Sequence, residues 1–132
     1  MSGLVKSGSA GLVSFLHQQG ERMELPKPFE RNIFLFHTYV AGTSHVMGIE
    51  ELEPYLNIGD KFTLLREPDN LFDSLAILVK NADGIKLGYV PRRDNAVFSR
   101  LMDAGKLLFA RLTDKEVSGG KVNLFIDIFL QD

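Results

Sequence analysis

The pattern of hydrophobic and polar positions along the last quarter of the chain has a period of two, which predicts a long hairpin. Segment 106–114 sets Leu107, Phe109 and Arg111 on one face against Leu108, Ala110 and Leu112 on the other, and segment 122–130 carries an apolar residue at every second position. Between them, Gly119 and Gly120 predict a turn. One face of this hairpin is therefore expected to lie on a hydrophobic core.

Four further segments predict strands: 32–41, 61–65, 75–80 and 85–90. Segment 32–41 is aromatic and β-branched on both faces, which predicts a strand at the centre of the sheet. Asp83-Gly84, between the last two segments, is typical of a tight hairpin turn.

The apolar stripe of segment 91–104 predicts a helix that Pro91 can begin and Gly105 ends. Shorter helical turns are expected at 49–56. Six strands and two flanking helices predict a mainly β fold, a small OB-like β-barrel. One core is expected, to which these residues contribute: Phe34, Phe36, Leu64, Ile77, Val79, Phe109 and Ile126, with the helix laid across it through Val97, Leu101 and Met102.

The first 30 residues differ from the rest of the chain. Ser9 can cap a short helix over 10–19, and Pro26 and Pro28 predict an extended linker over 21–30. Residues 1–30 are therefore expected to be an accessory segment that packs on the domain or contacts a partner protein or another copy. Residues 31–132 are expected to fold without it.

The composition is that of an ordinary globular domain, with 132 residues, 45% hydrophobic and 24% charged. The chain has no cysteine, which excludes disulfides and thiolate metal sites and fits a cytoplasmic location. No apolar run approaches the roughly 18 residues of a membrane span. The net charge of −2 argues against a broad nucleic-acid surface, so any such site is expected to be local.

The loop 66–73 joins two of the predicted strands and is longer than a minimal hairpin needs. It carries carboxylates, Arg66, and one large ring, Phe72. Two interpretations are open: Phe72 fills the core beneath the loop, or the loop carries function on a rigid scaffold.

The pattern Arg66-Glu67-Pro68-x-Asn70-x-Phe72-Asp73-x-x-Ala76-Ile77 resembles the signature of the HIRAN domain family. Shorter matches, in the same order as in the family, are Val40-Ala41-Gly42, Gly59-Asp60 and Leu87-Gly88-Tyr89-Val90-Pro91-Arg92. The resemblance covers about residues 31–112 and implies the same barrel. The sequence departs from the signature at Leu71, where proline is usual.

The resemblance implies that Phe72 stacks on a base and that Asp73 engages the terminal sugar hydroxyl of single-stranded DNA, with Asn70 beside them. A carboxylate accepts hydrogen bonds from a hydroxyl and repels a phosphate, so it can select a strand end. The alternative for Asp73 is a carboxylate that bonds the turn and pairs with Arg66.

Members that capture a 3′ end carry an arginine and aromatics where this chain has Thr43-Ser44-His45-Val46. His45 can still stack, but Ser44 cannot replace arginine at a phosphate, so weaker binding is expected. Arg92 and Arg93, at the start of the predicted helix, are phosphate contacts or a solvated basic turn. The predicted site is listed here: His45, Arg66, Asn70, Phe72, Asp73, Arg92 and Arg93.

The leading hypothesis is a module that binds single-stranded DNA or DNA 3′ ends in repair or stalled-fork processing. A protein-interaction or structural module on the same barrel is the alternative, favoured by the acidic residues Glu50, Glu51 and Glu53. A metal-dependent hydrolase, using His37, His45 and Asp73, is a remote third. Neither a phosphate-binding loop nor a nucleophile elbow is present, so neither an enzyme nor a cofactor or metal is expected.

Overall fold

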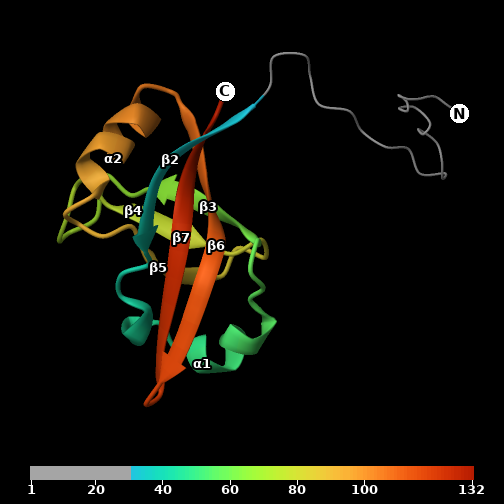
Figure 1. Cartoon of the computed structure of the whole chain (residues 1–132). Helices are drawn as coiled ribbons and strands as arrows, with labels where there is room; N and C mark the ends of the chain where they lie inside the picture. The colour runs from blue at the N-terminus through green and yellow to red at the C-terminus, as the bar shows by residue number, and fades with distance from the viewer. Residues whose placement is uncertain (1–30) are drawn as a thin grey trace, which may run out of the picture. The chain divides into compact units, whose positions relative to one another are not determined.

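The computed structural model describes residues 31–132, and their six strands form one antiparallel sheet in the order β2-β7-β6-β3-β4-β5 (Figure 1). The predictions for residues 1–30 lie outside the described residues. The strands are β2 (Asn32–Tyr39), β3 (Lys61–Arg66), β4 (Ile77–Lys80), β5 (Lys86–Tyr89), β6 (Leu107–Ser118) and β7 (Lys121–Gln131). The prediction of a mainly β fold with six strands is confirmed.

The sheet curls so that its two edge strands meet. Ala41, just beyond β2, and Tyr89 of β5 exchange two backbone hydrogen bonds of 2.7 and 2.9 Å. Gly88 makes this approach possible, because a Cβ there would overlap the carbonyl oxygen of Ala41. Its φ of 151° is also one that other residues rarely adopt. The curled sheet therefore resembles a half-barrel joined at one point.

The long hairpin of β6 and β7 supplies much of the core, as its alternation predicts. Leu112 of β6 lies opposite Ile126 of β7, and both are buried. Phe62 of β3 lies opposite Ala110 on the same inner face. The predicted core residues Leu64, Ile77, Val79 and Ile126 all belong to this cluster.

The prediction of a central strand at 32–41 is wrong, because β2 is an end strand of the sheet and pairs with β7. Phe34 and Phe36 are also exposed rather than in the core, with Phe34 54% exposed. A bulge between these two residues turns them to opposite faces. Phe34 meets Phe129 on the outer face, whereas Phe36 packs against Phe98 of the helix.

Phe109 is buried, but on the outer face of the sheet and outside the main core cluster. Its strand neighbour Ala110 faces the core, and successive side chains of a strand point to opposite faces. Phe109 stacks on Phe129 at 5.3 Å, and the Lys61 ammonium lies over its ring at 4.5 Å. The core prediction is therefore wrong for Phe109.

The C-terminal helix, α2 (Asn95–Asp103), begins four residues later than predicted. Residues 91–94 form a turn instead, in which the Asp94 N–H donates to the Pro91 carbonyl. The helix packs through buried Phe98 and partly buried Leu101, while Val97, predicted to face the core, is exposed. Arg92 and Arg93 therefore precede the helix.

The segment 43–55 contains three short helical pieces: η1 (Thr43–His45), α1 (Ile49–Leu52) and η2 (Glu53–Tyr55). The last two confirm the predicted helical turns at 49–56. Figure 1 places α1 near the tip of the β6–β7 hairpin and α2 toward the other end of the molecule. Within residues 31–132, no helix has the length and apolar character needed to cross a membrane.

Candidate functional site

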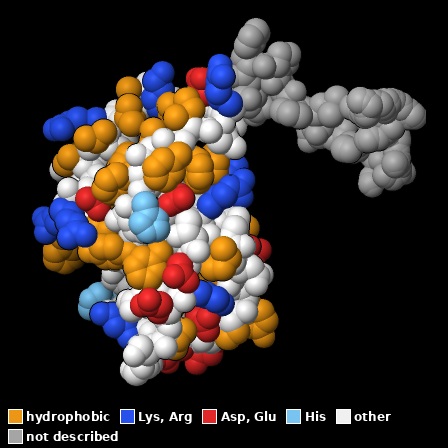
Figure 2. Space-filling view, in the orientation of Figure 1, with side chains coloured by type: hydrophobic (Ala, Val, Ile, Leu, Met, Phe, Trp, Pro, Cys, Tyr) orange, Lys and Arg blue, Asp and Glu red, His pale blue; other side chains and the backbone are white. Residues whose placement is uncertain are grey.

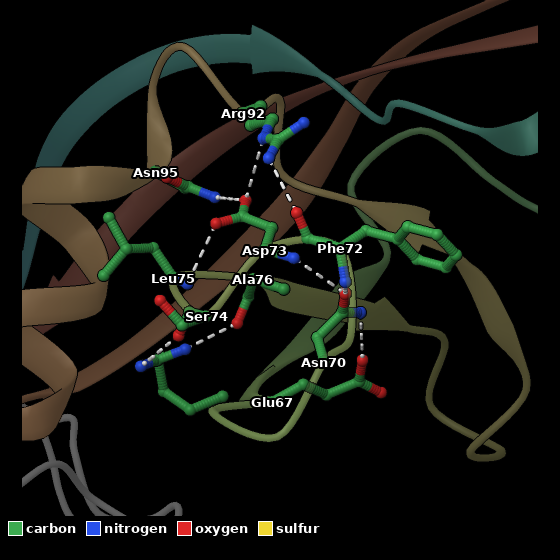
Figure 3. A network of polar contacts seen from close by, with 10 residues as sticks. Glu67, Asn70, Phe72, Asp73, Ser74, Leu75, Ala76, Arg92 and Asn95 are labelled. Carbon is green, nitrogen blue, oxygen red and sulfur yellow. Dashed lines mark hydrogen bonds and ion pairs between the residues drawn. The ribbon is translucent and has the colours of Figure 1, made fainter.

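The loop between β3 and β4 is held in shape by the side chain of Asn70 (Figure 3). Its Oδ1 accepts the backbone N–H groups of Phe72, at 2.8 Å, and Asp73, at 3.1 Å. Its Nδ2 donates to Glu67 Oε1 at 3.1 Å. Asn70 thus acts inside the loop, fixing the backbone that presents Phe72 and Asp73.

Asp73 is bonded on both carboxylate oxygens. Oδ1 accepts the Leu75 N–H at 2.9 Å, and Oδ2 accepts from Asn95 Nδ2 at 2.8 Å. These two hydrogen bonds, with a smaller contribution from the positive charge of Arg92, lower the pKa of Asp73. The carboxylate is therefore held ionised, and each oxygen has room for one more hydrogen bond because it carries two lone pairs.

Phe72 points away from this network into solvent, as Figure 3 shows, and is 83% exposed. Its backbone is nevertheless fixed, because its carbonyl accepts from Arg92 Nη2 at 2.6 Å. The interpretation that Phe72 fills the core beneath the loop is therefore wrong. A large apolar ring that stands in water on a fixed backbone is suited to contact a partner.

A cavity of about 270 Å³ lies beside Phe72, between the loop, the end of β5 and the turn before α2. Its walls are mostly apolar, and the polar groups in them include Asn70, Asp73 and Arg92. An apolar pocket with a few convergent polar groups is the usual form of a ligand site. The full lining is Ala41, Asn70, Phe72, Asp73, Ala76, Tyr89, Val90, Arg92 and Asn95.

Arg66 faces the inside of the loop rather than the cavity. Its guanidinium donates to the carbonyls of Ala76, at 2.7 Å, and Ser74, at 3.0 Å. It also pairs with Asp103 at 2.9 Å, at the end of α2. Arg66 therefore braces the loop against the helix, and the cation nearest to the Asp73 carboxylate is Arg92, at 3.7 Å.

Two of the predicted site residues lie apart from this cavity. The Arg93 guanidinium lies over the Tyr39 ring at 5.5 Å and pairs with Asp94 at 3.8 Å. His45 belongs to η1, which packs on β5 and β7, and it does not line the cavity. The structure thus brings together Asn70, Phe72, Asp73 and Arg92, with Arg66 behind the loop.

The sequence interpretation missed three residues that shape this site. Asn95, buried at the start of α2, holds Asp73 from 22 residues away. The Tyr89 hydroxyl donates to Glu67 at 2.8 Å, and burial, together with this carboxylate, raises the pKa of Tyr89. The hydrogen bond from Asn70, followed by that from Tyr89, lowers the pKa of Glu67. Glu67 and Tyr89 both stand in the segments that match the family signature, whereas no such match includes Asn95.

The metal site considered for a hydrolase, with His37, His45 and Asp73 as ligands, is not formed. His37 Nδ1 lies 2.7 Å from Asp127, across the β2–β7 pair and outside the cavity. Among residues 31–132, no three His, Cys, Asp or Glu side chains are grouped so that they could hold a metal ion.

The fold is a small curled-sheet domain with an apolar cavity beside its β3–β4 loop. The chain belongs to the HIRAN domain family, whose model matches residues 33–131 and whose members are DNA-binding modules. The match confirms the resemblance carried by the loop signature.

Solved structures agree with this assignment. A crystal structure of a protein from Lactobacillus plantarum has a TM-score of 0.71 and 28% identity, over 78% of this chain and 98% of the other. The crystal structure of the HIRAN domain of human HLTF has a TM-score of 0.60 and 16% identity, over 76% of this chain and 78% of the other. This second likeness shows the shared fold. No curated protein matches the sequence significantly.

Proposed function

We propose that this domain binds single-stranded DNA at a strand end, in the cavity beside Phe72. One observation carries the proposal: the exposed Phe72 ring stands at the rim of an apolar cavity whose wall contains the ionised Asp73 carboxylate. Membership of a DNA-binding family supports it.

Each part of the cavity has a distinct task in this proposal. A base stacks on Phe72, which contributes about 1–3 kcal/mol. The terminal sugar enters the cavity, and its free 3′ hydroxyl donates to Asp73. A phosphate in the same position would be repelled by the carboxylate, so the site prefers an unblocked end. Arg92, 3.7 Å from Asp73, reaches the next phosphate along the strand.

The segment Thr43-Ser44-His45-Val46 lacks the arginine and the aromatic residues that family members capturing a 3′ end carry at this position. Binding is therefore expected to be weaker than in members that carry them, with His45 and Arg93 as outer contacts of a longer strand. We infer a binding module rather than a catalyst, acting in DNA repair or at stalled forks. The cytoplasmic location indicated by the lack of cysteine stays a prediction.

The test is a titration of fluorescent single-stranded DNA with a free 3′ hydroxyl into the full chain, repeated with a 3′ phosphate. The unmodified protein should prefer the free end. Phe72→Ala should weaken binding about 5- to 150-fold, which corresponds to 1–3 kcal/mol. Asp73→Asn should abolish the preference between the two ends.

Leu71 provides the matched control, because it neighbours Phe72, is also largely exposed to solvent, and does not line the cavity. Leu71→Ala should bind as the parent does. Equal binding of free and blocked ends by the parent protein, together with an Asp73→Asn variant that binds both in the same way, would rule out end recognition.

A further inference from the structure

A second hollow lies outside the DNA cavity, beside α1. It has a volume of about 360 Å³ and a mostly apolar wall: Val46, Met47, Ile49, Leu52, Tyr55 and Ile85. We call this hollow the α1 groove. None of its residues lines the cavity beside Phe72. The proposed DNA site therefore leaves it unexplained.

Three side chains stand out around the α1 groove. Met47 is 99% exposed and Tyr55 77%, and Ile85, from the β4–β5 turn, is also exposed. They come from three separate segments of the chain but line the same hollow. Methionine and tyrosine are enriched where proteins bind other proteins. Such a concentration of apolar side chains in water marks an interaction surface.

The backbone that presents Met47 is fixed on both sides. Before it, the buried Thr43 hydroxyl donates to the Val122 carbonyl at 2.6 Å, and the Val46 N–H donates back to the Thr43 carbonyl. After it, the N–H of buried Ile49 donates to the Val46 carbonyl. Met47 is thus held at the crest of a hydrogen-bonded turn.

Tyr55 and Ile85 are fixed in comparable ways. Lys115 pairs with the Glu53 carboxylate at 2.7 Å and donates to the Glu53 carbonyl at 2.9 Å, which holds the turn that carries Tyr55. The buried Asn81 accepts the Ile85 N–H at 2.8 Å. Because little order has to be created on binding, a partner meets a low entropic cost here.

The charge in the wall of the α1 groove is negative. Glu51 is the one charged residue in its wall, with Glu50 exposed next to it. Of the nearby cations, Lys115 pairs with Glu53 and Lys86 lies over the Tyr89 ring at 4.8 Å, while Lys121 lines a neighbouring hollow together with Glu50. Figure 2 shows several acidic side chains, with lysine or arginine side chains among them, in the lower part of the visible face, toward the end where Figure 1 places α1. This charge repels phosphates and attracts lysine or arginine.

We propose that the α1 groove docks a short amphipathic segment of a partner protein, with an apolar face against Met47, Tyr55 and Ile85 and a basic residue on Glu51. A small molecule inside the hollow would leave Met47 in water, whereas a peptide extending beyond the hollow covers it. The domain would then hold nucleic acid and a protein partner on separate surfaces.

The test uses the full chain and a fluorescent synthetic helix with leucines on one face and lysines on the other. The parent protein should bind this peptide, and it should bind a matched leucine–glutamate peptide about tenfold more weakly, a difference of about 1.4 kcal/mol. Met47→Asp should weaken binding of the lysine peptide about tenfold. Glu51→Lys should shift the preference toward the glutamate peptide.

Ile58→Asp is the matched control, because Ile58 is an exposed apolar residue that does not line the α1 groove. This variant should bind the lysine peptide as the parent does. When the lysine peptide is added to the parent protein, the amide chemical shifts of residues 46–55 and 85 should change. The proposal is overturned if Ile58→Asp and Met47→Asp weaken binding equally, if both peptides bind alike, or if single-stranded DNA shifts the same amides.

Discussion

The loop beside α2 and the turn beside α1 both present an exposed apolar side chain on a hydrogen-bonded backbone, but the loop combines Arg92 with the Asp73 carboxylate, whereas the wall beside the turn carries only the carboxylate of Glu51. Phe72 stands on a loop fixed by Asn70, and an arginine lies beside it. Met47 stands on a turn fixed by Thr43, and carboxylates lie beside it. The two proposals therefore assign different partners to the same structural device: Arg92 suits a phosphate next to a strand end, and Glu51 suits a basic residue of a peptide.

The two regions also differ in how they are fixed. The loop beside Phe72 depends on charged groups, since Arg66, Asp73 and Glu67 supply most of its side-chain hydrogen bonds. The turn beside Met47 depends on a buried hydroxyl and on the packing of Ile49. Both are attached to the curled sheet, which joins at the Ala41–Tyr89 bridge.

The largest effect is expected where the sheet joins, because a change there disturbs both regions. Gly88→Ala places a Cβ against the Ala41 carbonyl in a backbone conformation unsuited to side chains. Overpacking and backbone strain together should lower the free energy of unfolding by about 3 kcal/mol or more. Urea unfolding measures this loss.

Gly84→Ala is the control for this prediction. Gly84 also has a positive φ, of 81°, but a Cβ there meets nothing within 4 Å. It should cost only about 1–2 kcal/mol, the strain of a left-handed residue. If Gly88→Ala and Gly84→Ala lowered the free energy of unfolding equally, the contact between residue 88 and Ala41 would not limit the closure of the sheet.

A smaller and more local effect is expected at Arg66. Comparing it with Arg92 distinguishes a residue that braces the loop from one that is proposed to contact a ligand. Its side chain is 13% exposed and donates to two carbonyls, whereas the side chain of Arg92 is 74% exposed. Arg66→Ala should lower the free energy of unfolding by about 2 kcal/mol because it removes both of these hydrogen bonds and the ion pair with Asp103. Arg92→Ala should cost less than about 1 kcal/mol.

The effects on DNA binding should have the opposite order: Arg92→Ala should affect it more than Arg66→Ala does. Measured at a temperature where both variants are folded, Arg92→Ala should weaken binding at low salt and reduce its salt dependence by about one phosphate. Arg66→Ala should leave the salt dependence unchanged. If the salt dependence falls for Arg66→Ala instead, the guanidinium of Arg66 reaches the strand.

The sequence predicts the loop well because its main contacts are local. Asn70 bonds residues two and three positions away, so a short signature contains both partners. Asn95 could not be predicted in the same way, because it reaches Asp73 from 22 residues along the chain. Only the folded sheet brings the start of α2 to the loop.

Periodicity predicts strands but not which of their faces is covered. The aromatic residues of 32–41 indicated a central strand, yet the bulge after Phe34 and the packing of Phe36 on α2 produce the same pattern at a sheet edge. The α1 groove was missed for a related reason. Met47, Tyr55 and Ile85 lie in three separate segments, and no spacing along the chain indicates that they line one hollow.

The smallest expected effect concerns pH and distinguishes the two regions by their charges. Asp73 is ionised in the folded loop with a pKa below its ordinary value of 3.8, because the Leu75 N–H and the Asn95 amide bond its oxygens. A carboxylate whose pKa is lowered by folding stabilises the folded state at any pH above its unfolded value. This stabilisation is lost as the pH falls through the folded value.

Asp73→Asn removes that contribution. The free energy of unfolding should be lower in the variant than in the parent by a constant amount above about pH 5, and the difference should shrink as the pH falls below the unfolded value. Urea unfolding of both proteins between neutral and acidic pH measures it. Thr43→Val, which removes the hydroxyl that fixes the turn beside Met47, should instead show a difference independent of pH, because a hydroxyl does not titrate in this range. If the free energies of unfolding of the parent and of Asp73→Asn differed by the same amount at every pH, the charge of Asp73 would not hold the loop.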